Sequence, residues 1–186
     1  IFFSAYASAV LMNMLKRQRD AVGLSFFSDK IDLHIPSKST RRHHQLLYHK
    51  LDHILKHEAL KFVKKTKSNQ AIHEISEMLH RRSLVMIFTD MISDEETLDK
   101  QFESFKHLKY NKHEVVLFYL NEQNTEIDLE FNDTAYNFID IETKEQIKLN
   151  PQQYKKEYQQ KYRKYLSDLK LRCLQYKIDL VEVDIN

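Results

Sequence analysis

The sequence predicts an α/β fold with a mainly parallel sheet, and three observations indicate it. Apolar, strand-like runs alternate with amphipathic helical segments along the chain. The runs at 83–89 (SLVMIFT) and 114–120 (EVVLFYL) are apolar on both faces, as in strands covered by helices on either side. The segment between them is long enough to cross back over a sheet. We expect a single domain over 1–186, with one antiparallel edge strand and a small β excursion.

The first part of the chain predicts a helix, a hairpin and two further helices. Residues 1–16 are apolar nearly all round, which predicts a buried helix. The run at 21–27 is a buried strand, and the alternating run at 30–35 is half-buried. Because a short turn joins these two runs, we expect them to pair antiparallel. Residues 40–57 form a helix, and Ser68 caps another.

The second part predicts two parallel strands, the excursion and a closing helix and strand. A helix with Leu98, Phe102 and Phe105 inward follows the run at 83–89. After the run at 114–120 the chain becomes acidic, with nine acids against three lysines over 112–150. We expect an acidic hairpin excursion at 121–150 there, with strands at 127–131, 138–141 and 146–149 around a turn at 142–145.

The end of the chain predicts a long helix and a last strand. Asn150 followed by Pro151 pairs an N-cap residue with proline at the first helical position. We expect a helix to about Tyr176 and an alternating strand over 178–185.

Composition excludes several kinds of site. The chain has one glycine, Gly23, where average usage would give roughly thirteen. A dinucleotide fingerprint, a Walker A loop and a nucleophile elbow each need more than one glycine. One cysteine, Cys173, excludes an intrachain disulfide and any zinc site with two thiolates. The 29 basic and 27 acidic residues nearly cancel, so total charge gives no case for a polyanion partner.

We expect a cytoplasmic location. The lone thiol suits a reducing compartment. The opening stretch, IFFSAYASAVLMNML, is shorter than the roughly 20 apolar residues that span a membrane. It also lacks the basic start and the cleavage site of a signal peptide.

Asp90 is the best-placed candidate for ligand contact. It ends VMIFTD, and ligands of open α/β sheets gather outside the carboxyl ends of the strands. With the hydroxyl of Thr89 it could hold Mg²⁺ directly or through water. The alternative is an aspartate that only caps the following turn.

Two other patterns have an ordinary explanation beside a functional one. His49, His53 and His57 lie four apart on a helix, a spacing that could chelate zinc, but they fall opposite the leucines and predict a solvated face. The final helix combines eight bases, two acids and a tyrosine stripe over 151–177. It could bind nucleic acid through Lys161, Arg163 and Lys164, or lay its tyrosines on the sheet with its lysines in water.

The order of segments resembles a known family. The segments are RQRDAVGLSFFSDKIDLHIPSKSTRRHHQLLYHKL, LVMIFTDM, HEVVLFYL, FIDIETKEQIKLNP and IDLVEVDI. They resemble the bacterial domain-of-unknown-function family fifty-eight, which is von Willebrand factor type A-like. The resemblance implies a doubly wound sheet and a Mg²⁺-dependent adhesion-type motif, D-x-S-x-S, on a first strand placed upstream of Ile1. It carries over Asp90 as a metal or partner contact, with Thr40 as a second ligand and Ser39 beside it at the partner site.

The resemblance also implies a class of function. It implies a protein-interaction adaptor that works with a MoxR-type AAA+ ATPase in complex assembly or stress response, with no established catalytic activity. A metal-dependent hydrolase using Asp90 and upstream carboxylates is a further alternative. Gly23 lies in mid-strand, which indicates a close approach by another chain segment, and we expect the upstream first strand to be that neighbour.

Overall fold

The computed structural model describes the chain except for residues 29, 58–67, 91–94 and 140–145. It divides into two compact units, Ile1–Arg81 and Arg82–Asn186, each described by itself below. In the described part of the chain, no helix combines the length and the apolar character needed to cross a membrane. The prediction of a single domain over 1–186 stays a prediction.

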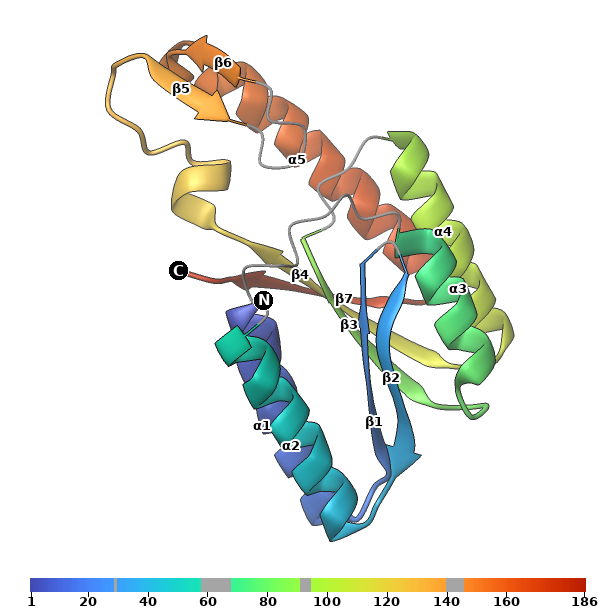
Figure 1. Ribbon diagram of the computed structural model, residues 1–186. Helices are drawn as coiled ribbons and strands as arrows, with labels where there is room; N and C mark the ends of the chain where they lie inside the picture. The colour runs from blue at the N-terminus through green and yellow to red at the C-terminus, as the bar shows by residue number, and fades with distance from the viewer. Residues whose placement is uncertain (29, 58–67, 91–94, 140–145) are drawn as a thin grey trace. The chain divides into compact units, whose positions relative to one another are not determined.

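The first unit is an antiparallel hairpin with helices on both faces (Figure 1). Its elements in chain order are α1 (Phe2–Gln18), β1 (Val22–Phe27), β2 (Ile31–Lys38), α2 (Arg41–His57) and α3 (Ser68–Met78). The antiparallel pairing of β1 with β2 confirms the expectation from the short turn. Helices α1 and α2 pack together and against β1, and α3 contacts both strands.

Alternate side chains of β1 pack into a core shared with α1 and α2. Val22 is buried in a core with Ala5 and Met12 of α1 and Leu47 and Leu51 of α2. Leu24 and Phe26, two and four residues on, pack against the same core, as the period of a strand requires.

One expectation for the first unit needs correction, and a contact at Gly23 needs to be added. Helix α1 is not fully buried: Ala5 and Met12 are its buried residues, whereas Phe2, Tyr6 and Val10 are more than half exposed. The apolar composition of the segment hides this difference, because both sides of the helix carry apolar residues. The close approach to Gly23 that the structure describes comes from β2, which the expectation did not name. A Cβ built on Gly23 would lie 2.8 Å from the carbonyl oxygen of Ile35, on β2.

A shift in pairing register explains this close approach. Val22 pairs with Lys38 but Leu24 pairs with Ile35, so β2 carries one residue more than β1 across this step. Such a bulge bends the strand that carries the extra residue, and here the backbone of β2 comes close to Gly23. Gly23 is therefore needed for contact within the hairpin.

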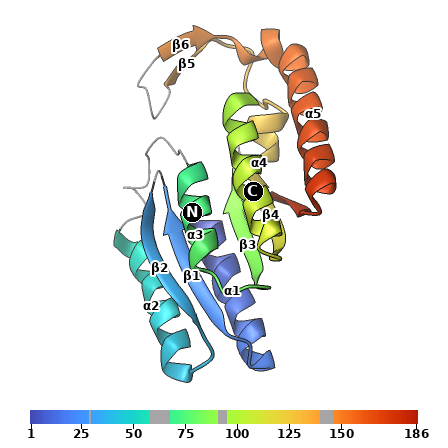
Figure 2. The ribbon, with the colours of Figure 1, turned by 90° about the vertical axis from the view of Figure 1, so that its right-hand side faces the viewer.

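The second unit is built on a three-stranded parallel sheet of order β3-β4-β7. Its main elements are β3 (Leu84–Thr89), α4 (Glu95–Tyr110), β4 (Glu114–Asn121), α5 (Pro151–Tyr176) and β7 (Asp179–Asp184). Helices α4 and α5 contact each other; α4 also contacts β4 and α5 contacts β7. In Figure 2, α4 lies over β3 and β4, and α5 stands at the right. The predicted parallel strands and the closing helix and strand are confirmed. The mixed α/β class is confirmed as well.

Buried side chains alternate along the central strand of this sheet. Val115, Leu117 and Tyr119 are almost completely buried, and Tyr119 reaches α5 through its hydroxyl. This face of β4 therefore lies under the helices. The register pairs Ile87 of β3 with Leu117, which extends the same buried layer.

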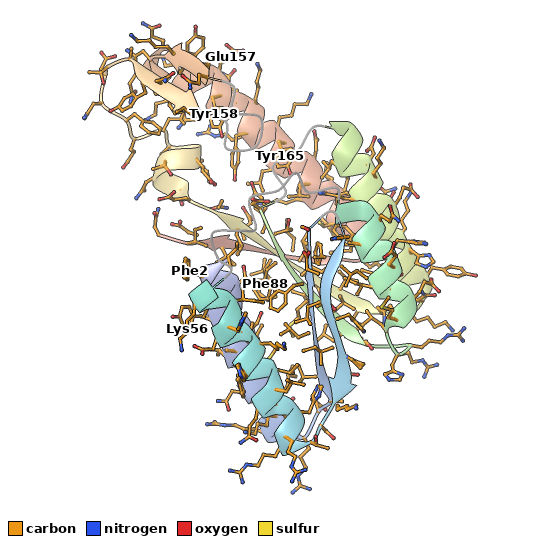
Figure 3. The ribbon with its side chains drawn as sticks, viewed as in Figure 1. Phe2, Lys56, Phe88, Glu157, Tyr158 and Tyr165 are labelled. Atoms are coloured by element: carbon orange, nitrogen blue, oxygen red, sulfur yellow. The ribbon has the colours of Figure 1, made fainter. Side chains whose placement is uncertain are left out.

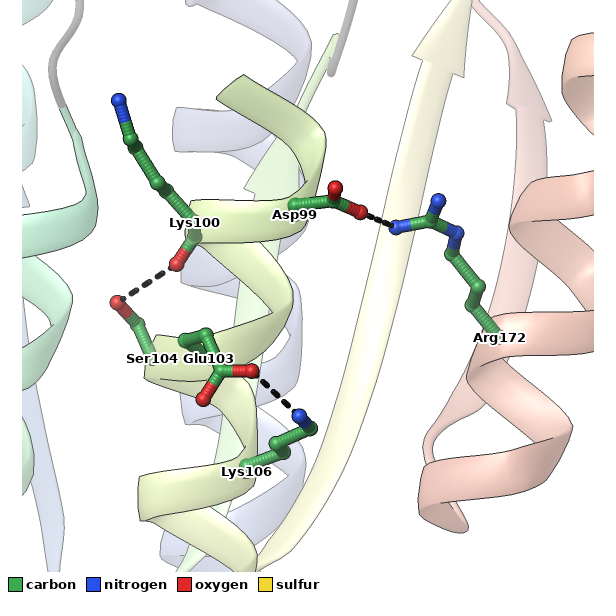
Figure 4. A network of polar contacts seen from close by, with 6 residues as sticks. All are labelled: Asp99, Lys100, Glu103, Ser104, Lys106 and Arg172. Carbon is green, nitrogen blue, oxygen red and sulfur yellow. Dashed lines mark hydrogen bonds and ion pairs between the residues drawn. The ribbon is translucent and has the colours of Figure 1, made fainter. Parts of the chain in front are cut away.

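An ionic contact joins α4 to α5 (Figure 4). Arg172 of α5 pairs with Asp99 of α4, and its guanidinium also lies 5.7 Å from the ring centroid of Phe102. Within α4, Lys106 pairs with Glu103 at 2.5 Å, and the Ser104 hydroxyl donates to the Lys100 carbonyl. Of these contacts, the two made by Arg172 link α5 to α4.

The excursion contains one hairpin and one helical turn. β5 (Tyr136–Ile139) pairs antiparallel with β6 (Gln146–Leu149), which confirms the predicted hairpin. β6 has the predicted bounds, whereas β5 begins two residues before the strand predicted at 138–141. The predicted turn at 142–145 lies outside the described residues. The predicted strand at 127–131 is wrong, because a π-helical turn, η1 (Gln123–Ile127), precedes an irregular segment there.

Side-chain hydrogen bonds explain why 127–131 does not form a strand. The Gln152 amide donates to the carbonyl oxygens of Leu129 (3.2 Å) and Phe131 (2.6 Å). Leu129 adopts a positive φ of 45°, which a strand cannot contain. The last apolar residue of the segment, Phe131, instead packs in a small aromatic cluster, where its ring contacts the rings of Tyr136 and Phe138.

Candidate functional site

The carboxyl ends of the three parallel strands share one edge of the second unit's sheet. β3 ends at Thr89, β4 at Asn121 and β7 at Asp184. The Ile185 amide donates to the Asn121 carbonyl at 2.9 Å, and the Gln123 amide donates to the Asp184 carboxylate at 3.3 Å. Chain segments leaving β4 and β7 are thus tied together at the edge where open α/β proteins place their ligands.

Asp90 directly follows β3 at this edge. Its side chain is exposed, and its charge reaches the phenol of Tyr165 on α5. Burial, then Tyr162, then the negative charge of Asp90 raise the pKa of Tyr165 to about 12. The predicted position of Asp90 directly after a strand of the parallel sheet is confirmed, although β3 is an outer strand of the described order β3-β4-β7 and not a central one. The role of Asp90 as a ligand contact stays a prediction.

A line of tyrosines connects α5 to the sheet. The hydroxyls of Tyr119 and Tyr162 are 3.1 Å apart, and Tyr158 stacks on Tyr162 with ring centroids 6.4 Å apart. Tyr158 and Tyr165 are labelled along α5 in Figure 3. The predicted laying of the tyrosine stripe on the sheet is confirmed for Tyr162, whereas Tyr154 is 52% exposed.

Glu126 brings a second carboxylate to these tyrosines. It lies in η1, where its carboxylate accepts a hydrogen bond from the Glu122 amide at 3.0 Å. Burial is the main cause of the raised pKa of Tyr119, Tyr158 and Tyr162, and the charge of Glu126 raises all three further. We name this region the acidic tyrosine edge; its residues are Asp90, Tyr119, Glu126, Tyr158, Tyr162 and Tyr165.

Sequence reasoning found only part of this edge. Asp90 and the α5 tyrosines were visible from strand position and helical spacing. Tyr119 was counted as one apolar residue of a strand, and Glu126 fell in the acidic excursion at 121–150, just before the predicted strand at 127–131. A signal for Glu126 did exist, because a glutamate four residues after Glu122 can cap the turn that contains both.

The residues at hand do not build a metal site by themselves. Among the residues that the structure describes, no three His, Cys, Asp or Glu side chains gather closely enough to hold an ion. The charge of Asp90 acts on the phenol of Tyr165, and a phenol with a raised pKa is a poor ligand for a hard cation. A Mg²⁺ site at Asp90 would therefore need ligands from outside this set.

The other predicted contact residues, Ser39 and Thr40, belong to the first unit. Both are exposed. The Thr40 hydroxyl accepts a hydrogen bond from the His43 amide at 3.3 Å, so it caps the start of α2. This cap gives Thr40 a structural role, and its predicted role at a metal or partner site is untested.

The histidines at 49 and 53 lie on the solvated side of α2. Both are exposed, which confirms the predicted solvated face for these two positions. The side chain of His57 lies outside the described part of the chain.

The basic side of α5 is exposed at the predicted residues. Lys161, Arg163 and Lys164 all lie in solvent, and Lys161 pairs with Glu157 at 2.7 Å. This pairing lowers the pKa of Glu157. Further along the helix, Lys170 pairs with Glu182 of β7 at 2.7 Å. Acids of α5 and β7 therefore neutralise part of the positive charge that the sequence shows.

Comparison with known proteins identifies a family over most of the chain. The family model described as "Protein of unknown function DUF58" matches residues 3–167. No curated protein and no solved structure matches the chain. The hairpin, the strand before Asp90 and the segment FIDIETKEQIKLNP lie within the matched range, whereas IDLVEVDI at 178–185 lies beyond it. The chain therefore belongs to the DUF58 family.

Proposed function

We propose that this chain is a protein-interaction module of the von Willebrand factor type A-like kind that binds its partner at the acidic tyrosine edge. The partner we propose is a MoxR-type AAA+ ATPase, and the setting is assembly of complexes or a stress response. The observation that carries the proposal is the placement of Asp90, Glu126 and the α5 tyrosines together at the carboxyl edge of a parallel sheet.

The chemistry of this edge suits a protein surface. Tyrosine supplies a large, rigid ring with a polar end, and it is enriched where proteins bind each other. Tyr158 is 38% exposed, and its ring stacks on Tyr162. Because the stacking already holds the ring in place, a partner could bury its exposed surface with little loss of side-chain entropy. Asp90 and Glu126 add charge beside these rings, which favours orientation of a partner over bulk affinity.

A doubly wound sheet of the von Willebrand factor A type is part of this proposal. The parallel order β3-β4-β7, with α4 crossing between β3 and β4, supports it. In the described residues β3 pairs on one side only, with β4, although its run is apolar on both faces. Such a strand is typical of the interior of a sheet. Mg²⁺, if bound, would sit at Asp90 and link the carboxylate to a partner oxygen.

The edge carries no recognised set of groups for catalysis among the residues described. A nucleophile needs a base within hydrogen-bond reach. The hydroxyl of Tyr119 is hydrogen-bonded to the hydroxyl of Tyr162, which is a phenol and not a base. Burial raises the pKa of Tyr119 and of the lone thiol, Cys173, whose pKa reaches about 12, so both stay protonated and unreactive at neutral pH. We therefore propose binding without turnover.

A capture experiment tests the proposal. The chain is immobilised and offered a MoxR-type AAA+ ATPase, with and without EDTA. Asp90→Ala and Tyr158→Ala should each weaken capture roughly tenfold, the loss of about 1.4 kcal/mol. Asp179→Ala is the matched control, because Asp179 is an exposed acid that begins β7, at the opposite edge of the same sheet. Equal capture by Asp90→Ala, Tyr158→Ala and the control, or no capture at all, would contradict the proposal.

A further inference from the structure

His44 is a titratable side chain enclosed in the core of the first unit. It lies in the first turns of α2 and is 1% exposed. Leu47 and Leu51 follow it at spacings of three and seven residues, so the three share one face of the helix. Those leucines pack against Ala5 and Met12 of α1. His44 therefore belongs to the layer between α2 and α1.

The ring of His44 has no hydrogen-bond partner for either nitrogen among the described residues. The neighbouring His43 differs, because its Nε2 donates to the Val22 carbonyl of β1 at 2.8 Å. A buried ring with two unpartnered nitrogens is already costly when neutral. Adding a proton would place a positive charge in the same enclosure with no acceptor for either N–H.

The surrounding charges oppose that proton as well. Among the described residues, the titratable groups that bear on His44 are Lys16 of α1 and His43 of its own helix. Burial first, then the positive charge of Lys16, then His43, lowers the pKa of His44. The N-terminal end of α2, where His44 lies, also disfavours a cation.

We propose that His44 is an acid-sensitive switch in the packing of α1 against α2. Uncharged, it fills the layer between the helices; protonated, it leaves that layer, and the first unit loosens as the pH falls below neutrality. This inference is independent of the function proposed for the second unit, because the two rest on different residues.

The sign of the effect follows from linkage. The ring binds a proton less readily in the folded chain than in the unfolded chain, whose histidines titrate near about 6.5. Stability is therefore complete above that value and is lost as the pH falls through it toward the folded pKa. In that window the ratio of folded to unfolded chain falls by up to about tenfold for each pH unit.

Urea unfolding of the full 186-residue chain between about pH 8 and about pH 5 tests the switch, with α-helical circular dichroism as the signal because the chain has no tryptophan. His44→Leu should lose the part of the acid dependence that His44 supplies. His49→Leu, a change at an exposed histidine of the same helix, should keep it. Equal acid dependence in the wild type and His44→Leu would overturn the proposal.

A second measurement decides the question if His44→Leu does not fold. The ring protons of His44 can be followed by NMR in the folded wild-type chain while the pH is lowered. We expect His44 to titrate below about 6.5, the value of an unperturbed histidine, and to do so together with faster amide exchange in α1 and α2. Titration of His44 at or above that value would overturn the proposal.

Discussion

The two units hold their strands in different ways. In the first unit the backbone of β2 lies directly against Gly23 of β1, so the hairpin depends on the absence of a side chain. In the second unit the sheet is tied to α5 by side chains, above all by the hydrogen bond between Tyr119 and Tyr162. The first unit should therefore be more sensitive to substitution at this contact than the second unit is at its own. A backbone contact cannot rearrange as a flexible side chain can.

Substitution at Gly23 should give the largest effect in the chain's β1 strand. In Gly23→Val the new Cβ would lie 2.8 Å from the Ile35 carbonyl oxygen and 3.1 Å from the Ser37 amide nitrogen, both backbone atoms. One of the strands must shift, and overpacking of this kind costs about 3 kcal/mol. Urea unfolding followed by circular dichroism measures the loss.

Ser25→Val is the matched control for this prediction. Ser25 lies in the same strand, and its hydroxyl is hydrogen-bonded to Nδ1 of His34 at 2.9 Å. Losing this bond should cost about 1 kcal/mol. If Gly23→Val destabilises the chain no more than Ser25→Val does, then the bulge relaxes and the contrast between the units is lost.

High pH should weaken the second unit through its buried phenols. The folded structure raises the pKa of Tyr119, mainly by burial and then by its bond to Tyr162, and raises that of Tyr165 to about 12. Unfolded tyrosines ionise near about 10, so stability is complete below that value and is lost as the pH rises above it. Stability curves between about pH 8 and about pH 11 should show this loss.

Two variants separate the phenols from general alkaline unfolding. Tyr119→Phe should cost about 1 kcal/mol at neutral pH but lose much of the alkaline dependence, because a phenylalanine ring has no hydroxyl proton to release. Gly23→Ala should lower stability at every pH and leave the alkaline slope unchanged. An unchanged slope in Tyr119→Phe would show that the contact with Tyr162 does not control the second unit's response to base.

The same contrast explains how far the sequence could predict the molecule. Period and apolar character identified the hairpin, the parallel strands and α5, because burial imposes those patterns. They failed at 127–131, where Gln152 of a distant helix takes up the carbonyl bonds that a strand would have used. They also missed β2 as the close neighbour of Gly23, because a bulge depends on the pairing register of two strands and cannot be read from either strand alone.

Reversing the exposed positive charges of α5 should have the smallest effect on stability of the changes considered. The same variant tests the alternative function, nucleic-acid binding. Reversal of Lys161, Arg163 and Lys164 to Glu changes exposed residues, and we expect stability to move by less than about 1 kcal/mol. The matched control reverses Lys50 and Lys56, exposed bases of α2 in the first unit. We expect neither set to affect capture of the ATPase, and no salt-dependent binding of duplex DNA or RNA by the wild type. Binding that weakens with salt and is lost only when the α5 bases are reversed would instead assign the chain's function to the basic side of α5, because released counterions leave that signature.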